Sequence, residues 1–328
     1  MEERDEVKKT QQEKVKEITE KLHEGIKNLF NSDTYRNYLK TMSKFTNYSF
    51  NNTLLIGMQR PDTQAVAGYK AWETKFHRTV KKGSKGIQIL SPAPYTVKVE
   101  EPKRDALGNV LRDSDGKEIM EEVEKIRQAF KVAYVFAYED TEGEPLPEIV
   151  TLLDKEVKDY DKLMDVLKEV SPCPIHFVPI ESTANGYYHL ENRSIYIKAD
   201  LPQLQKVKTC VHEIAHAILH DRIEGEDVEA TKREKEVCAE SVAFVVCEYL
   251  QLDTSQYSFG YISGWSAGRE LKELQSKMEL IRKTADTIIS GIEQKMIQRL
   301  TQSHTMEQET VQDMSLDKSN QKTMHRGM

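Results

Sequence analysis

Apolar positions recur along the chain with two periods, and each period predicts one kind of element. Spacings of three and four residues predict amphipathic helices. Those helices cover residues 1–30, 151–170, 204–218, 234–250 and 271–292. Short runs rich in β-branched and aromatic residues predict strands. Those strands cover residues 130–138, 175–180, 184–190 and 194–199, the last two forming a hairpin. The mixture predicts the α+β fold class.

Turn and linker signals divide the chain into two domains and a tail, for which 328 residues suffice. The segment TEGEPLPEI is typical of a linker and predicts a boundary near residue 147, so the domains are residues 1–147 and 148–300. Glycine turns within residues 100–125 predict a long hairpin in the first domain. Residues 301–328 are rich in Gln, Ser, Thr and Met, and we expect them to be disordered.

The run CVHEIAHAILH carries the sharpest chemical signal in the sequence. His212 and His216 lie four residues apart in a predicted helix, so their imidazoles share one face about 6 Å apart along the axis. That spacing suits two ligands of one tetrahedral zinc ion. Glu213 lies about 100° round the helix, where it can take a proton from a zinc-bound water. The alternative is a helix with two surface or hydrogen-bonded core histidines.

A hydrolytic zinc site needs a third protein ligand and one open position. His220 lies about 12 Å along the axis from His212, too far to reach the same ion. Glu236 and Glu240 share an apolar face of the next helix, where a carboxylate is unexpected unless something pairs with it. We expect Glu236 to be the third ligand and Glu240 to accept a hydrogen bond from a ligating histidine. The reversed assignment stays open, as do glutamates that reach water at the helix edge.

Composition excludes several other classes of protein. Charged residues make up 31% of the chain, the net charge is −7, and no apolar run reaches the length of a membrane span. The charged N-terminus lacks the apolar segment of a secretory signal. None of the four cysteines forms a C-x-x-C pair, which argues against a cysteine zinc site. We therefore expect a cytoplasmic protein with no membrane partner.

The first half contains a basic block within an acidic protein. From Lys44 to Lys98, nine basic residues face two acidic ones, and aromatic residues lie between them. Such a surface suits single-stranded DNA, because lysines neutralise phosphates and any base can stack on a ring. The residues of this candidate surface are Lys70, Trp72, Lys75, Arg78, Lys81, Lys82 and Lys85. The alternative is a core formed by Trp72 and Phe76 beside a solvated lysine turn.

Segments from both halves resemble one known family. NYSFNNTLLI, VAGYKAWETKFHRTVKKGSKGIQILSP and VFAYEDTEGEPLP resemble the N-terminal domain of ArdC-type antirestriction proteins. HEIAHAILH, EVCAESVAFVV and YSFGYISGW resemble the zincin-like metallopeptidase domain that follows it, in relatives also called LtrC-like and carried by conjugative elements. The resemblance covers about residues 20–300. The chain departs from it at Ala137, Glu139 and Asp140, where family members often carry an Asp and a Gln.

The resemblance implies a function for each domain. The N-terminal domain would bind single-stranded DNA, and the protein would protect incoming unmodified DNA from host restriction. The zincin-like domain would hold Zn²⁺ through His212, His216 and a glutamate matching Glu236, with Glu213 as catalytic base. Two other functions stay open. One is a site-specific protease that cleaves an unidentified protein, whose backbone pairs with the strand at 194–198. The other is a non-catalytic DNA-binding protein with a structural zinc ion.

Overall fold

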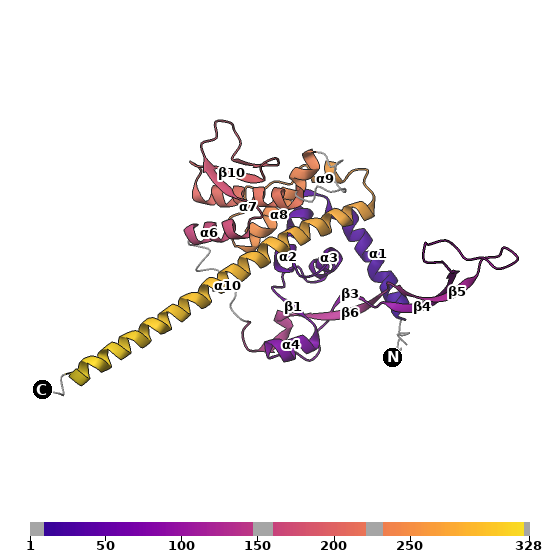
Figure 1. The fold of residues 1–328 in the computed structure, drawn as a ribbon, viewed down its shortest axis with the longest axis horizontal. Helices are drawn as coiled ribbons and strands as arrows, with labels where there is room; N and C mark the ends of the chain where they lie inside the picture. Colours follow the sequence, from indigo (N-terminus) through magenta and orange to yellow (C-terminus); the bar gives the residue numbers. More distant parts are fainter. Residues whose placement is uncertain (1–9, 147–159, 221–231, 325–328) are drawn as a thin grey trace, which may run out of the picture. The chain divides into compact units, whose positions relative to one another are not determined.

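The computed structural model of the chain describes residues 10–146, 160–220 and 232–324, with side chains to residue 301 except those of His220 and Leu300. The chain forms two compact units (Figure 1). The N-terminal unit is Met1–Gly25 with Leu55–Gly143, and the C-terminal unit is Ile26–Leu54 with Glu144–Met328. Both mix helices and strands, which confirms the predicted two-domain α+β class. No helix in the described part combines the length and apolar character that a bilayer span needs.

The N-terminal unit is built from short strands and one short helix. In chain order it contains β1 (Val66–Ala67), α4 (Tyr69–Phe76), β2 (Arg78–Val80), β3 (Ile87–Pro92), β4 (Tyr95–Pro102), β5 (Met120–Arg127), β6 (Phe130–Ala137), the 3-10 helix η1 (Tyr138–Asp140) and β7 (Thr141–Gly143). β6 lies between β1 and β3, β2 pairs with β7, and β4 pairs with β5, all antiparallel. α1 (Gln11–Leu29) and α3 (Phe50–Gln59) each cross from one unit into the other.

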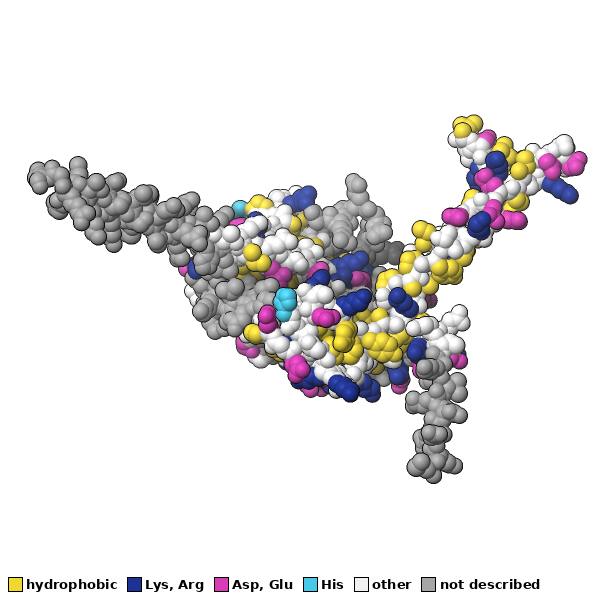
Figure 2. Space-filling view, turned by 90° about the horizontal axis from the view of Figure 1, so that it is seen from below, with side chains coloured by type: hydrophobic (Ala, Val, Ile, Leu, Met, Phe, Trp, Pro, Cys, Tyr) yellow, Lys and Arg dark blue, Asp and Glu magenta, His cyan; other side chains and the backbone are white. Residues whose placement is uncertain are grey.

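The predicted long hairpin at residues 100–125 is confirmed. β4 and β5 pair from Tyr95 opposite Arg127 to Pro102 opposite Met120. Gly108 and Gly116 have φ angles of +88° and +80°, a conformation that glycine adopts at little cost in tight turns. Apolar side chains remain exposed along the hairpin, and Figure 2 shows them in yellow.

The C-terminal unit surrounds two central helices, α7 (Gln203–His220) and α8 (Lys232–Tyr249). Its other elements are α2 (Ser32–Lys44), α6 (Tyr160–Val170), β8 (Ile175–Val178), β9 (Gly186–His189), β10 (Ser194–Lys198), α9 (Ile262–Ser266) and α10 (Leu271–Met324). α7 packs against β9 and β10 and against α8, while α8 also packs against α2 and α10 (Figure 1). This packing buries all but three residues of α8 between Val237 and Tyr249.

The strand order of this unit corrects one prediction. β10 lies in the middle of the sheet, parallel to β8 and antiparallel to β9. Its backbone hydrogen bonds are used on both sides, so the prediction that a substrate pairs with the strand at 194–198 is wrong. Among the described strands, β9 is the edge strand on the side of the cavity described below.

Residues 26–54 belong with the C-terminal unit, although they precede the predicted boundary by about a hundred residues. Tyr35 is fully buried, its hydroxyl lies 2.8 Å from the Ser241 hydroxyl, and its ring packs edge-on against Phe259. The predicted boundary at residue 147 falls in 147–159, outside the described residues. The domain ranges 1–147 and 148–300 therefore stay a prediction.

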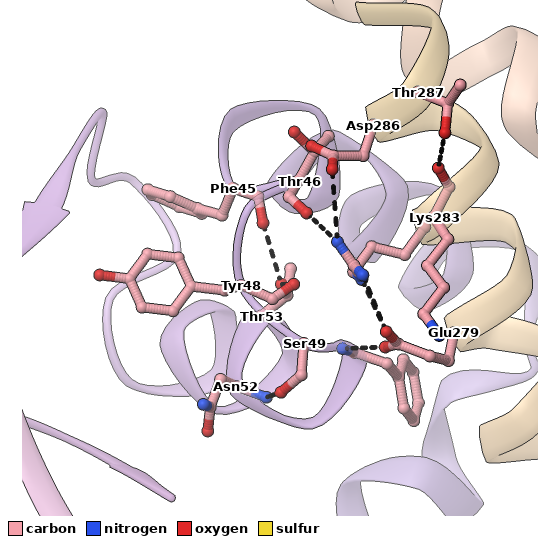
Figure 3. Close-up of polar contacts among 12 residues, drawn as sticks. Phe45, Thr46, Tyr48, Ser49, Asn52, Thr53, Glu279, Lys283, Asp286 and Thr287 are labelled. Atoms are coloured by element: carbon pink, nitrogen blue, oxygen red, sulfur yellow. Dashed lines mark hydrogen bonds and ion pairs between the residues drawn. The ribbon is translucent and has the colours of Figure 1, made fainter. Parts of the chain in front are cut away.

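Polar contacts fix the loop before α3, and the start of α3, to α10 (Figure 3). The Phe50 N–H donates to Glu279 at 2.8 Å. Arg282 donates to the same carboxylate at 2.8 and 3.0 Å and also to the Thr46 carbonyl. A glutamate that accepts one backbone and two guanidinium hydrogen bonds holds its partners in a defined geometry. A segment that resembles the N-terminal domain of a family is thus built into the C-terminal unit.

The predicted amphipathic stripe of the last helix is confirmed in α10. Its buried residues include Leu274, Met278, Ile281, Ala285, Ile288 and Ile292. The expected disordered tail, residues 301–328, overlaps α10 as far as Met324, and its side chains beyond residue 301 lie outside the described ones. Disorder of residues 301–328 therefore stays a prediction.

Gly186 lets β9 approach α7 closely. A Cβ at this position would lie 2.7 Å from Thr209 Cγ2 and 2.9 Å from the Tyr196 carbonyl oxygen. We expect Gly186→Ala to reduce the free energy of unfolding by about 1–3 kcal/mol, because overpacking forces strand and helix apart. Urea unfolding measures the effect. Gly260→Ala, whose nearest contact is 3.9 Å away, should leave stability nearly unchanged, and equal losses in both variants would contradict this explanation.

Candidate metal centre and candidate nucleic-acid surface

Three side chains converge between α7 and α8 with their ligand atoms in a triangle. The Nε2 atoms of His212 and His216 are 3.0 Å apart, and Glu236 Oε2 lies 3.5 Å and 3.6 Å from them. A tetrahedral ion with bonds of about 2.0–2.1 Å holds its ligand atoms roughly 3.3 Å apart. Two imidazole nitrogens and a carboxylate oxygen are also the donor types that zinc takes in hydrolytic sites. The chain's own residues therefore fit a zinc ion.

Glu236 and Glu240 occupy different positions around the histidines. Glu236 faces Nε2 of both rings, whereas Glu240 Oε2 lies 3.4 Å from Nδ1 of His212. A carboxylate on the far nitrogen orients a ligating imidazole and fixes its tautomer. The geometry thus favours Glu236 as ligand and Glu240 as acceptor over the reversed assignment. Ala239 and Ala243, fully buried on the same helix, allow α8 to approach α7.

Hydrogen bonding sets the charge of the metal-free triangle. Burial by itself lowers the pKa of His212, but hydrogen bonds to Glu236 and Glu240 outweigh it and raise this pKa to about 10. Hydrogen bonds from His212 and His216 hold the pKa of Glu236 well below its usual range. Without metal, a proton on His212 therefore occupies a nitrogen that a cation would need.

Glu213 lies beside the triangle but outside it. Its side chain is buried, and the backbone N–H of Tyr188 on β9 donates to its carboxylate. Burial raises the pKa of Glu213, and although His212 and His216 oppose that rise, the net shift is upward. A carboxylate with a raised pKa is a better proton acceptor near neutral pH than an ordinary one.

The triangle opens onto a cavity of about 870 Å³ lined by β9, α7, α8 and residues 256–257. Tyr257 lines it with its ring, while its hydroxyl lies 3.5 Å from Cys247 Sγ rather than beside the ligands. Lys208 also lines the cavity, one helical turn before His212. α7 continues through His220, whose side chain lies outside the described ones.

Two residues of the predicted DNA-binding surface have another role, and their assignment is corrected. Trp72 is 1% exposed and its Nε1 donates to the Phe136 carbonyl, so its ring is core and cannot stack on a base. Arg78 is 6% exposed, donates to Thr141 and Gly143, and lies over the Tyr138 ring. It holds β2 against β7 and offers no charge to a phosphate.

The five lysines of that surface are exposed: Lys70, Lys75, Lys81, Lys82 and Lys85. Lys70 and Lys75 lie on α4, and the other three lie in the turn between β2 and β3. Figure 2 looks from the side on which α4 lies in Figure 1, and dark-blue side chains gather on this face with apolar ones between them.

Two exposed aromatic rings belong to the same unit as the five lysines. Tyr69 is 53% exposed and Tyr134 is 45% exposed. A Cβ on Gly86, at the end of the lysine turn, would lie 3.0 Å from the Tyr134 ring, so this ring lies against the turn. Sequence reasoning missed Tyr134 as a candidate. Tyr134 lies opposite Gln88 in the β3–β6 ladder, close to the lysine turn. A prediction of that strand pairing from the sequence would have identified Tyr134 as a candidate.

Two family models match separate parts of the chain. One, for the N-terminal domain of the anti-restriction factor ArdC, matches residues 8–136. The other, a peptidase M78 model described as the IrrE N-terminal-like domain, matches residues 169–250, which contain the histidine pair, Glu236 and Glu240.

Individual proteins are also similar to this chain. An uncharacterized protein of Bacillus anthracis is 25% identical over 87% of this chain, which spans about half (52%) of that protein's length. Two crystal structures of antirestriction protein ArdC from the R388 plasmid each cover 76% of this chain. The metal-free structure is 20% identical over 85% of its own chain, with a TM-score of 0.42. The Mn(II)-bound structure is 17% identical over 86% of its chain, with a TM-score of 0.40.

The two matched domains account for the two chemistries of the chain, a basic surface in one unit and a histidine–glutamate centre in the other. The chain therefore combines an ArdC N-terminal domain with a zincin-like domain of the peptidase M78 type, the domain arrangement of an ArdC-type protein.

Proposed function

We propose that this protein protects single-stranded DNA during conjugative transfer and that its C-terminal unit is a zinc-dependent peptidase. The observation that carries the peptidase is the triangle of His212, His216 and Glu236 beside a buried Glu213, open to a large cavity. Zinc is the proposed ion because the donor set suits it. The cytoplasmic location stays a prediction.

Each residue around the triangle has a separate role in the proposed hydrolysis. A zinc ion bound there would polarise the scissile carbonyl and lower the pKa of water. Glu213 accepts the proton of the attacking water and returns it to the leaving amine. Glu240 keeps the Nδ1 proton of His212 in place, so that Nε2 stays unprotonated as a ligand.

The edge strand β9 can align an extended peptide. In the β9–β10 ladder, Lys198 donates to the Asn185 carbonyl, so the backbone groups of Gly186 and Tyr188 point to the outer edge. The Tyr188 N–H binds Glu213, and the backbone of Gly186 faces the cavity. A substrate strand added at this edge would pass in front of the histidines.

A purely structural ion is the weaker alternative. A structural zinc site is closed by four protein ligands, whereas a catalytic site keeps one position open. Here three side chains meet, and the remaining side adjoins the 870 Å³ cavity rather than packed side chains.

Metal affinity should depend on pH in a defined direction. Because the pKa of His212 is raised to about 10 in the metal-free protein, a cation must displace its proton at neutral pH. We expect the apparent zinc affinity to rise about tenfold per pH unit from pH 7 to 9, measured by competition with a chromophoric chelator. Glu240→Gln should bind zinc about 10–100-fold more weakly and with a flatter slope. A flat wild-type profile would show that His212 is neutral without metal.

The DNA-binding part rests on the five exposed lysines and the rings of Tyr69 and Tyr134. We expect Lys81→Gln, Lys82→Gln and Lys85→Gln together to weaken binding to oligothymidylate on the order of 100-fold at 0.1 M salt. The slope of log affinity against log salt should fall by about 2, because three phosphate contacts are lost. Fluorescence anisotropy over a salt series measures both.

A control variant removes the same charge from α1 through Lys16→Gln, Lys21→Gln and Lys27→Gln, three exposed positions. It should keep the wild-type affinity and slope. Undiminished binding by the lysine-turn variant would rule this turn out as the interface.

A further inference from the structure

Lys208 occupies an unusual position for a lysine. It is 6% exposed, yet it lines the cavity together with His212 and His216, which follow it at intervals of four on one face of α7. Its ammonium lies 5.6 Å from the centroid of the Tyr257 ring. One helical turn, about 6 Å, separates it from the first histidine along the axis.

No carboxylate of the described residues forms a direct ion pair with this ammonium, although exposed Asp253 and buried Cys247 interact with its charge at longer range. Lys208 forms no ion pair and no side-chain hydrogen bond with a described residue, and its ammonium lies over the Tyr257 ring. A buried charge without an anionic partner is costly, and a ring face compensates only part of that cost. A ligand that places an anion beside this ammonium would therefore gain binding free energy, because it would offset the cost of the buried charge.

The other charged residues that line the cavity also favour an anionic ligand. Besides Lys208, Lys232 and Lys235 line it, and neither forms an ion pair with a described residue. The three glutamates of the lining are already engaged, two by His212 and His216 and one by the Tyr188 N–H. A divalent cation in the triangle would leave the six charged side chains and the ion with an excess of two positive charges.

We infer that Lys208 binds a carboxylate of the substrate and makes the site selective for acidic peptides. This inference rests on the proposed peptidase function and adds its substrate class. An extended chain advances about 3.3 Å per residue, so the acidic group lies within about three residues of the bond that is cut. The carboxylate comes from an Asp or Glu side chain or from the peptide's own C-terminus.

A peptide suits this position better than a nucleic acid. Lys208 lines a cavity beside an edge strand, where a backbone can add to β9 and direct one side chain inward. Single-stranded DNA is bound along exposed grooves of lysines and rings. Such residues are found on the other unit, around Tyr69 and Tyr134.

The test uses the full chain with Glu213→Gln, loaded with zinc, so that bound peptides are not cut. Two pools of randomised, acetylated pentapeptides are applied, one amidated and one with a free C-terminal carboxylate, and retained peptides are sequenced by mass spectrometry. We expect Asp and Glu to exceed Asn and Gln at one position by about ten- to a hundredfold. If instead the free-carboxylate pool is retained whatever its side chains, the C-terminus is the source.

Substitutions at Lys208 give the decisive comparison. Lys208→Met should lose the preference, and Lys208→Arg should keep it, which separates a lost charge from a disturbed fold. Lys206→Met, on the same helix but outside the cavity lining, is the matched control and should behave as the parent. Equal acidic enrichment in Lys208→Met, or no acidic enrichment in the parent, would overturn the inference. So would Lys208-dependent displacement of the peptides by oligothymidylate, since the anion would then be a phosphate.

Incubation of the wild-type protein with the same pools separates this inference from the proposed function. Acid-selective retention without any cleavage would leave the Lys208 site standing and reject the peptidase. Cleavage without acidic preference would support the peptidase and reject the Lys208 site.

Discussion

Glu213→Gln is expected to slow peptide hydrolysis by about 10²–10⁴-fold while zinc stays bound. The amide has nearly the shape of the carboxylate but cannot accept a proton from water. Its oxygen can still accept the Tyr188 N–H, so β9 and α7 should keep their positions. The ligand triangle does not include Glu213, and the zinc content should therefore match that of the wild type.

The measurement pairs two readouts on one preparation. Cleavage of a randomised peptide pool is followed by mass spectrometry, and bound zinc is measured by elemental analysis. Glu181→Gln, an exposed glutamate outside the cavity lining, is the matched control and should cleave at the wild-type rate. A Glu213→Gln protein that cleaves normally would remove Glu213 from the role of base, and one that lacks zinc would make it part of the metal site.

The same variant separates the two units in cells. If proteolysis produces antirestriction, Glu213→Gln should lose protection of transferred DNA while its binding to oligothymidylate is unchanged. If it protects fully, protection comes from the DNA-binding surface, and the peptidase acts in another step. The lysine-turn variant should give the opposite pattern, with normal cleavage and weaker DNA binding.

The cluster of His212, His216 and Glu236 was predictable because its geometry follows largely from local spacing. Two histidines four apart share a helix face in any fold, and a glutamate on an apolar face of the next helix needs a partner. The choice between Glu236 and Glu240 was not decided by spacing, because both share one face of α8. It depends on how α8 packs against α7, which sets one carboxylate against both Nε2 atoms and the other against Nδ1.

The errors arose where contacts distant in sequence decide the outcome. Trp72 and Arg78 lie within the basic block of the sequence. Their hydrogen-bond partners, Phe136 on β6 and Thr141 on β7, follow more than sixty residues later. A residue type that suits DNA binding can still be buried by residues that are distant in the sequence. Likewise, the hairpin of β9 and β10 was predictable, but the parallel addition of β8 made β10 central and left β9 at the edge.

Contacts distant in sequence also place residues 26–54 with the C-terminal unit. Residues 26–54 carry a family resemblance to an N-terminal domain, yet Tyr35 and Phe50 contact Ser241 and Glu279. Linker composition near residue 147 could not reveal those contacts. Separate expression of either half at that boundary would therefore expose the buried face of α2 or of α8.

His216→Ala is expected to abolish zinc binding at micromolar metal and with it the stabilisation that zinc gives. Removing one of three ligands leaves His212 and Glu236, and two ligands do not hold zinc against water and chelators at this concentration. In the wild type, zinc at a hundred times its dissociation constant should stabilise the folded protein by about 2.7 kcal/mol. The variant should melt at the same temperature with and without zinc.

The metal-free forms supply the control for misfolding. His216 is only partly buried, so its replacement by alanine removes the contact with Glu236 without leaving a large cavity. The metal-free variant and the metal-free wild type should therefore melt within a few degrees of each other. His23→Ala, an exposed histidine on α1, should keep the full zinc effect. If zinc stabilises His216→Ala as much as the wild type, the ion is bound elsewhere, and the peptidase loses its structural basis. If zinc stabilises neither, the triangle is a hydrogen-bonded cluster that keeps His212 protonated, and the activity of the protein depends on its DNA-binding surface.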